Sequence, residues 1–233
     1  MRTIILTIIY IFWARLSIGS QCLNLAQILH PTKSAMPFRE GSGARQVRGA
    51  RSSPNIWYLR NWIVLITGCS PGGLGFETAR ALAHHAPKLI ILAGRSLKSL
   101  NAAIEQISAE GTSAPTRTLK LDLSAQKEVR KAAEEFNSWA DAPHVDILIN
   151  NAGVMDCPFE LNGDGIESQF ATNHIGHFLF TNLILDKILK AGNDARIVNV
   201  SSAGHQQSGV RFDDYNFSVC VRNFKTIQRN WQV

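Results

Sequence analysis

From Trp62 onward, short apolar runs alternate with longer amphipathic stretches. Such runs are typical of strands buried on both faces, and the amphipathic stretches are typical of helices. We predict five strands, at residues 63–67, 89–93, 118–121, 145–149 and 196–200, and helices near 75–86, 96–110, 124–140 and 165–190. Right-handed crossovers then give an α/β fold, a Rossmann-like doubly wound parallel sheet with the first strand in a central position.

Composition divides the chain into four segments. Residues 1–20 hold a signal-like or anchor-like apolar run, and residues 21–60 are a basic stretch that we expect to be a disordered linker. Residues 61–218 carry the alternating pattern and form the predicted nucleotide-binding domain. Residues 219–233 lack the periodicity of a helix and form an atypical tail. We therefore expect one domain between two extensions.

The apolar run at residues 4–14 has the shape of a signal peptide. Its eleven residues are too few to cross a hydrocarbon core of about 30 Å, which needs roughly 20 residues in a helix. Three interpretations stay open: a cleaved signal, an interfacial membrane anchor, or a non-native extension of the reading frame. We accordingly predict a cytoplasmic or endoplasmic-reticulum-associated protein, with secretion if the segment is a true signal.

The basic residues that give the chain its net charge of +6 lie mostly outside the predicted domain. Residues 61–218 contain 13 Lys and Arg side chains against 17 Asp and Glu, a net charge of −4. Binding to a phosphate backbone needs a basic surface, so we expect no nucleic-acid partner. The four cysteines lack metal-site spacing, and His174 and His177 have no third ligand beside them, so we predict no metal.

A glycine-rich turn follows the first predicted strand and opens the first helix. Its sequence is Thr67-Gly68-Cys69-Ser70-Pro71-Gly72-Gly73-Leu74-Gly75. Glycines allow backbone amides to approach a pyrophosphate, which then lies against the positive end of the helix. The strand, turn and helix context favours dinucleotide binding over a turn that is merely tight.

Further motifs connect this turn with a known family. They are Asn150-Asn151-Ala152-Gly153, residues 167–178 and Arg196-Ile-Val-Asn-Val-Ser-Ser202. Together they resemble the short-chain dehydrogenase/reductase family, in particular the subgroup of retinol dehydrogenases, Tic32-type proteins and WW-domain oxidoreductases. The resemblance covers roughly residues 61–217 and implies hydride transfer between NAD(P)(H) and a lipophilic alcohol or carbonyl. The chain departs from the family in one extra loop residue before Gly73.

The resemblance also implies a set of cofactor-binding residues. It places the Asp122 carboxylate near the adenine ring, although a helix-capping Asp fits the sequence equally well. Asn150 to Gly153 either brace the central sheet or line the cofactor pocket. The implied cofactor-binding residues are Thr67, Gly68, Ser70, Gly73, Leu74, Gly75, Arg95, Asp122, Leu123, Asn151, Ala152 and Gly153.

Arg95 favours NADP(H) over NAD(H) as the cofactor. An acidic residue near position 94 would hold the ribose 2′-hydroxyl of NAD(H), and none is present. The guanidinium of Arg95 instead suits a 2′-phosphate. Its alternative role is that of a solvated surface charge.

Only half of the family's catalytic set is found. Ser202 resembles the Ser that hydrogen-bonds the substrate oxygen, and Asn173 resembles the Asn that holds a relay water, with a structural role as its alternative. The Tyr-x-x-x-Lys pair that supplies the proton is absent, because Lys225 lies ten residues beyond Tyr215 and so on another helical face. The C-terminal strands are missing too. We therefore expect a truncated sheet with an unpaired edge at the fifth strand, and little or no catalysis.

Two other classes of function compete with an oxidoreductase. One is a non-catalytic nucleotide-binding or interaction module, which needs only the predicted cofactor half. The other is a membrane-anchored structural protein, which rests on residues 4–14 alone.

Overall fold

The computed structural model describes residues 5–11, 59–202 and 210–218, the first of these segments as backbone only. Within them, a parallel sheet has the strand order β1-β6-β5-β2-β3-β4. Its strands are β1 Ile5–Ile11, β2 Ile63–Thr67, β3 Leu89–Gly94, β4 Thr116–Lys120, β5 Ile147–Asn150 and β6 Arg196–Ser202. The five predicted strands are confirmed with shifts of one or two residues.

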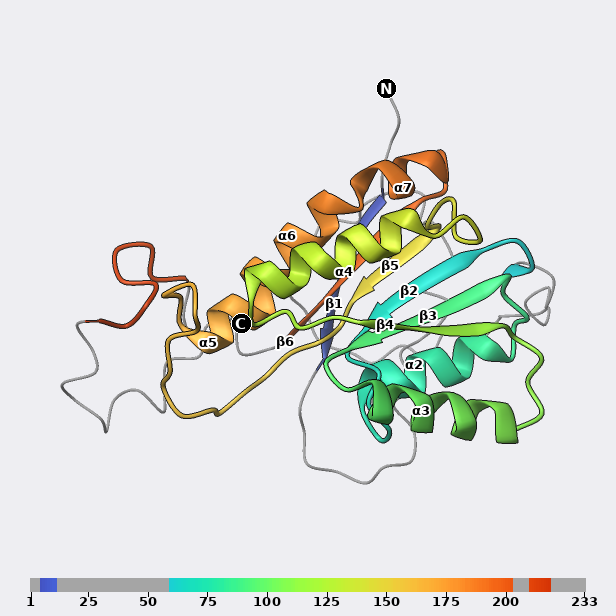
Figure 1. Ribbon diagram of the computed structural model, residues 1–233, viewed down its shortest axis with the longest axis horizontal. Coiled ribbons are helices and arrows are strands. Elements are labelled where there is room, and N and C mark those ends of the chain that lie inside the picture. Colours follow the sequence, from blue (N-terminus) through green and yellow to red (C-terminus); the bar gives the residue numbers. More distant parts are fainter. Residues whose placement is uncertain (1–4, 12–58, 203–209, 219–233) are drawn as a thin grey trace, which may run out of the picture.

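Helices cover both faces of the sheet (Figure 1). One face carries α2 Leu74–Ala83 and α3 Leu97–Ala109, and the other carries α4 Gln126–Ser138, α6 Gly176–Leu183 and α7 Leu185–Lys190. The predicted helix at 165–190 is divided: α5 Ser168–Phe170 runs into the π-helical turn η2 Ala171–Ile175, and Ile184 separates α6 from α7. The backbone of Ile184, at φ −104° and ψ 7°, leaves the helical range there.

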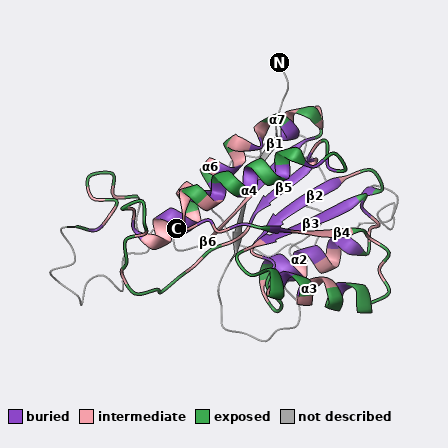
Figure 2. Cartoon of the chain, viewed as in Figure 1, coloured by how far each residue is buried: buried purple, intermediate pink, exposed green. Residues whose placement is uncertain are grey.

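Burial on both faces explains the continuous apolar runs. Ile63 and Leu65 of β2 belong to the core beneath α4 and α6, whereas Val64 and Ile66 belong to the core beneath α2 and α3. All four are fully buried, and Figure 2 shows the central strands as buried along their length. A strand whose alternate residues enter two different cores requires apolar side chains at every position.

The strand order creates a switch point beside β2. From β2 the chain crosses to β3 and then β4 on one side, and it returns to place β5 and then β6 on the other. This confirms the central position predicted for the first strand of the domain. In such sheets a crevice opens at the carboxyl ends of the strands where the order reverses.

Strand β1 was not predicted from the sequence. It pairs in parallel with the whole of β6, from Ile5 opposite Arg196 to Ile11 opposite Ser202. The expectation that the fifth predicted strand leaves an unpaired edge is therefore wrong, because β1 covers that edge. Residues 1–4 and 12–20, residues 21–58 of the linker predicted at 21–60, and the tail at 219–233 lie outside the described residues. Leu59, at the end of the predicted linker, is buried in the core of the domain.

Within the described ranges, no helix combines the length and the hydrophobicity that a membrane span requires.

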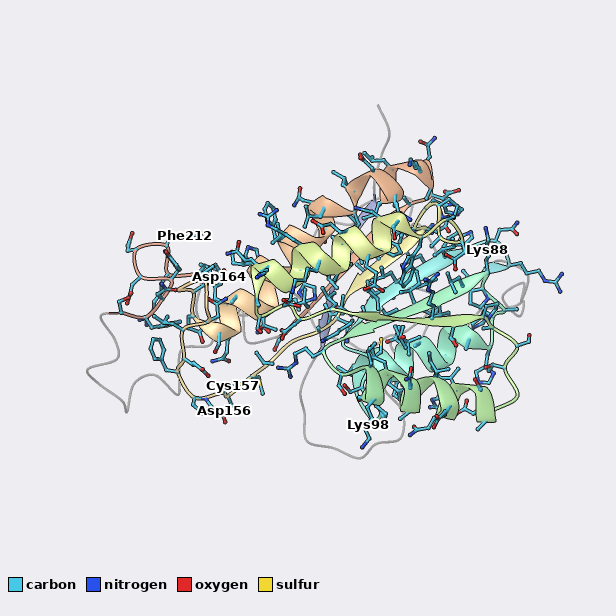
Figure 3. All side chains as sticks on the ribbon, viewed as in Figure 1. Lys88, Lys98, Asp156, Cys157, Asp164 and Phe212 are labelled. Atoms are coloured by element: carbon cyan, nitrogen blue, oxygen red, sulfur yellow. The ribbon has the colours of Figure 1, made fainter. Side chains whose placement is uncertain are left out.

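Two of the four cysteines fall in the described ranges. Cys69 is buried in the glycine-rich turn, and Cys157 is exposed in the loop after β5 (Figure 3). Both are free thiols.

Candidate cofactor site

A cavity of about 560 Å³ lies at the carboxyl ends of the strands. Twelve of the fourteen residues predicted for the site line it, which leaves out only Gly75 and Asp122. The sequence did not single out the other lining residues, which are Ala93, Gly94, Ser96, Ser99, Leu121, Val154, Met155, Gln169, Thr172, Val200 and Ser201. Most of them lie within two residues of a predicted residue, whereas Ser99 lies on α3 and Gln169 on α5. Their place depends on packing rather than on a motif.

The extra residue of the glycine-rich turn is absorbed in a tight turn at Ser70–Gly73. The amide of Gly73 donates to the carbonyl of Ser70 at 3.0 Å, and Gly72 has a φ of +77°. Pro71 before a glycine of positive φ is the pattern of a type II turn. Because a Cβ on Gly72 would meet nothing within 4 Å, the added residue projects outward and leaves the rest of the loop in place.

Two other glycines of this loop are required by close packing. A Cβ on Gly75 would lie 2.5 Å from Asn151 Nδ2 and 2.6 Å from the carbonyl oxygen of Gly68. A Cβ on Gly68 would lie 2.7 Å from the Cα of Ala152. Gly75 therefore shapes the site from behind the cavity wall. Helix α2 starts after Gly73 without a side-chain cap, so its first amides are not held by a capping side chain.

Arg95 is the only charged residue of the cavity lining within the described part of the chain. It is exposed, follows the end of β3 and lies beside Ser96 and Ser99 in that lining. No carboxylate in the described residues pairs with its guanidinium. The lining also contains no Asp or Glu from those residues, so this end of the cavity offers a cation and hydroxyl groups to a ligand.

Asp122 does not line the cavity. Its Oδ1 accepts hydrogen bonds from the amide of Ser124 at 3.0 Å and from Ser124 Oγ at 2.6 Å. The carboxylate thus stabilises the local turn before α4, and its contact with an adenine ring stays a prediction. The neighbouring Leu121 and Leu123 do line the cavity.

The Asn-Asn-Ala-Gly segment divides between bracing the sheet and lining the cavity. Asn150 braces the sheet, since its Nδ2 donates to Thr181 Oγ1 at 3.1 Å and to Asn199 Oδ1 at 2.9 Å. Asn151, Ala152 and Gly153 line the cavity instead. The backbone amides of Asn151 and Ala152 both donate to Thr67 Oγ1, at 3.0 and 2.9 Å, which ties the end of β5 to the end of β2.

Asn173 lies in the π-helical turn and holds the loop after β5. Its Oδ1 accepts from the amide of Val154 at 2.8 Å, and its Nδ2 donates to the carbonyl of Val154 at 2.9 Å. Both polar atoms of the amide are thereby engaged with the backbone. This arrangement agrees with the structural role left open for Asn173.

His177 is a buried residue that the sequence did not assign to the site. Its Nε2 lies 2.9 Å from Thr67 Oγ1, and its Nδ1 lies 3.0 Å from the carbonyl oxygen of Asn173. Burial lowers the pKa of His177 to about 4, which the Asn173 carbonyl opposes only in part. The imidazole is therefore neutral near pH 7. No signal in the sequence distinguishes His177 from any other polar residue of an amphipathic helix.

Ser202 lines the cavity at the end of β6, as predicted. Tyr215 does not line it; its ring lies 6.0 Å from that of Phe170, and the adjacent Asn216 is bonded to Glu167 and Gly165. Within the described residues, the lining contains no Tyr and no Lys. These residues also contain no cluster of three or more His, Cys, Asp or Glu side chains that could hold a metal.

A family model described as "short chain dehydrogenase" matches residues 62–218. The chain is 47% identical over 159 residues to short-chain dehydrogenase TIC 32 A, chloroplastic, of Brassica napus, covering 65% of this chain and 48% of that protein. It is 43% identical over 162 residues to human retinol dehydrogenase 13, covering 70% of this chain and 47% of that protein. The chain thus spans about half the length of these curated relatives.

Solved structures show the same architecture. A short chain dehydrogenase from Salmonella enterica superimposes with a TM-score of 0.55 at 27% identity, covering 78% of this chain and 77% of that one. Another, from Shigella flexneri 2a in complex with NADP, superimposes with a TM-score of 0.52 at 28% identity, covering 64% and 63%.

Proposed function

The chain belongs to the short-chain dehydrogenase family, and on that premise we propose that it is an NADP(H)-binding oxidoreductase chain whose substrate is a lipophilic alcohol or carbonyl. The observation that carries the proposal is the cavity at the strand ends. Its lining from the described residues combines a glycine-rich turn at one helix terminus with Arg95 as its single charged side chain. This combination suits a pyrophosphate and a further phosphate group.

The residues present fit NADP(H) in two places. The turn at residues 68–74 and the first amides of α2 would hold the pyrophosphate, because no side chain caps them. Arg95, with Ser96 and Ser99 beside it, would hold the ribose 2′-phosphate. A carboxylate that would accept hydrogen bonds from a free 2′-hydroxyl is missing from this lining in the described part.

Two residues of this chain would serve the reaction at the other end of the cavity. NADP(H), when bound, supplies or accepts a hydride at the substrate carbon. Ser202 would donate a hydrogen bond to the substrate oxygen, as the serine of the family does. Asn173 fixes the loop at Val154 and so keeps the wall of the cavity in position.

The substrate class is supported by the relatives. Several of them are named retinol dehydrogenases, and retinol is a lipophilic alcohol. Association with the endoplasmic reticulum membrane belongs to the same proposal. Because residues 5–11 pair with β6 as β1, fractionation of cells that express the full chain tests it: the proposal requires that the chain sediment with the membranes.

A second function, a nucleotide-binding module without catalysis, is favoured by one observation. No Tyr or Lys of the described residues reaches the cavity, so these residues supply no family-type proton donor. General acid catalysis typically contributes 10² to 10⁴-fold to a rate. We therefore expect turnover well below 1 s⁻¹, the low end of ordinary enzymes, when the chain oxidises NADPH with a reactive carbonyl. Turnover at or above 1 s⁻¹ would refute the proposal that the chain binds the nucleotide without catalysis.

Cofactor binding is tested by titrating the full chain with NADPH and NADH and following the fluorescence of the nucleotide. Arg95→Ala should weaken NADPH binding by about tenfold to a hundredfold, since hydrogen bonds to charged groups contribute about 1.5–3 kcal/mol, and should leave NADH binding nearly unchanged. Lys98→Ala is the matched control, because Lys98 is an exposed cation on α3 outside the cavity lining (Figure 3). Equal affinity of the wild-type chain for both nucleotides would overturn the assignment of Arg95.

A further inference from the structure

His177 lies outside the cavity lining and contacts two residues that belong to it, Thr67 and Asn173. Its side chain is buried, with 6% of its surface exposed, and it does not line the cavity. It comes from α6, yet its two ring nitrogens face Thr67 at the end of β2 and the carbonyl of Asn173 in the π-helical turn. Both partners hold the segment after β5, Thr67 at the amides of Asn151 and Ala152 and Asn173 at Val154.

The hydrogen bonds around Thr67 determine where the protons lie. Thr67 Oγ1 accepts from the amides of Asn151 and Ala152, which occupies both of its lone pairs. Its own proton must then be donated to Nε2 of His177. The ring consequently carries its proton on Nδ1, which donates to the carbonyl of Asn173. One neutral tautomer satisfies all of these groups.

We propose that His177 is a positioning residue for the dinucleotide, which acts by fixing Thr67 and Asn173. This inference rests on the proposed NADP(H) binding. By accepting the proton of Thr67, His177 leaves that oxygen free to hold the amides of residues 151 and 152 against the glycine-rich turn. By donating to Asn173, it holds the π-helical turn whose side-chain amide clamps Val154.

The close packing in this region makes the position of the wall critical. The Cα of Ala152 stands so near Gly68 that a methyl group on the glycine would meet it at 2.7 Å. A small displacement of residues 151–154 therefore alters the space beside the turn. Without the histidine, the hydroxyl of Thr67 turns toward another acceptor, and its two amide bonds weaken.

The test measures NADPH affinity in variants that keep one of the two hydrogen bonds of the histidine at a time. His177→Phe removes both hydrogen bonds and should raise the Kd by about tenfold. His177→Gln keeps a polar atom near the place of Nε2, and His177→Asn keeps a donor near the place of Nδ1, so each should recover part of the loss. His144→Gln is the control, because His144 is half-buried beside Asp146 at the opposite end of the sheet.

A double-mutant cycle separates positioning from general support of the fold. In the Thr67→Val background, His177→Phe should cost less NADPH affinity than it does in the wild-type chain, because the hydrogen bond to Thr67 is already gone and only the one to Asn173 remains to be lost. Independent losses that multiply would overturn the proposal. Each Kd is measured at a temperature well below the thermal unfolding midpoint of the variant. A loss of stability alone then leaves the Kd unchanged.

The nitrogen shifts of the imidazole give a readout that needs no nucleotide. The proposal requires an Nδ1–H tautomer in the wild-type chain, and an Nε2–H tautomer would refute it. A wild-type chain that binds neither NADPH nor NADH would overturn the proposed function together with this role. Wild-type binding combined with an unchanged Kd in His177→Phe would overturn the role of His177 alone.

Discussion

Acid should destabilise this protein through the buried ring of His177. Burial lowers the pKa of His177 from 6.5 to about 4 in the folded chain. The unfolded chain therefore binds a proton more readily than the folded chain between these two values. The contribution of the neutral ring to stability is complete above pH 6.5 and is lost as the pH falls toward 4.

The size of this effect follows from the shift. Each pKa unit corresponds to 1.36 kcal/mol, so the full loss is roughly 3 kcal/mol, of which about 2 kcal/mol is lost between pH 7.5 and pH 5. That is a large share of the 5–15 kcal/mol typical of a domain. The surface carboxylates with lowered pKa values, Glu110, Glu128 and Asp141, stay ionised above pH 5 and do not contribute in this range.

The measurement is urea unfolding followed by circular dichroism at several pH values between 7.5 and 5. The wild-type chain should lose about 2 kcal/mol more over this range than His177→Gln, which cannot take up the proton. His85→Gln, which removes a histidine after the end of α2, is the matched control and should follow the wild type. Parallel curves for the wild type and His177→Gln would refute the assignment of a buried neutral imidazole.

Two further predictions concern packing. Gly75→Ala should destabilise the fold by about 1–3 kcal/mol, because the added methyl group meets Asn151 and Gly68. Gly163→Ala is the control and should be neutral in the same unfolding assay, because a Cβ there meets nothing within 4 Å. Equal unfolding midpoints for the two variants would contradict the close packing at Gly75. Deletion of residues 1–11 should expose the edge of β6 and promote self-association measurable by light scattering, and a deletion variant that stays monodisperse at the same concentration would contradict the pairing of β1 with β6.

The sequence predicts the sheet of the domain well because burial on both faces forces each strand to be a continuous apolar run. The same runs place the carboxyl ends of β2 and β5 side by side, so the sequence alone predicts that the glycine-rich turn and the Asn-Asn-Ala-Gly segment lie next to each other. Arg95 and Ser202 follow from their positions at strand ends. Local periodicity and motif spacing therefore suffice for the parts of the site that the strand ends position.

Contacts between distant segments follow other rules. The composition of the run at residues 4–14 fits a buried strand and a signal segment equally well. Only the pairing of residues 5–11 with β6 distinguishes the two interpretations. His177 has the sequence context of any polar residue in an amphipathic helix. Its two hydrogen bonds depend on how that helix is rotated against β2. The π-helical turn sets this rotation, because it adds one residue to a turn of the helix. A helix of regular pitch through residues 171–175 would turn His177 by about 100° about the axis and take its ring away from Thr67. The site thus depends on an irregularity that no periodic pattern encodes.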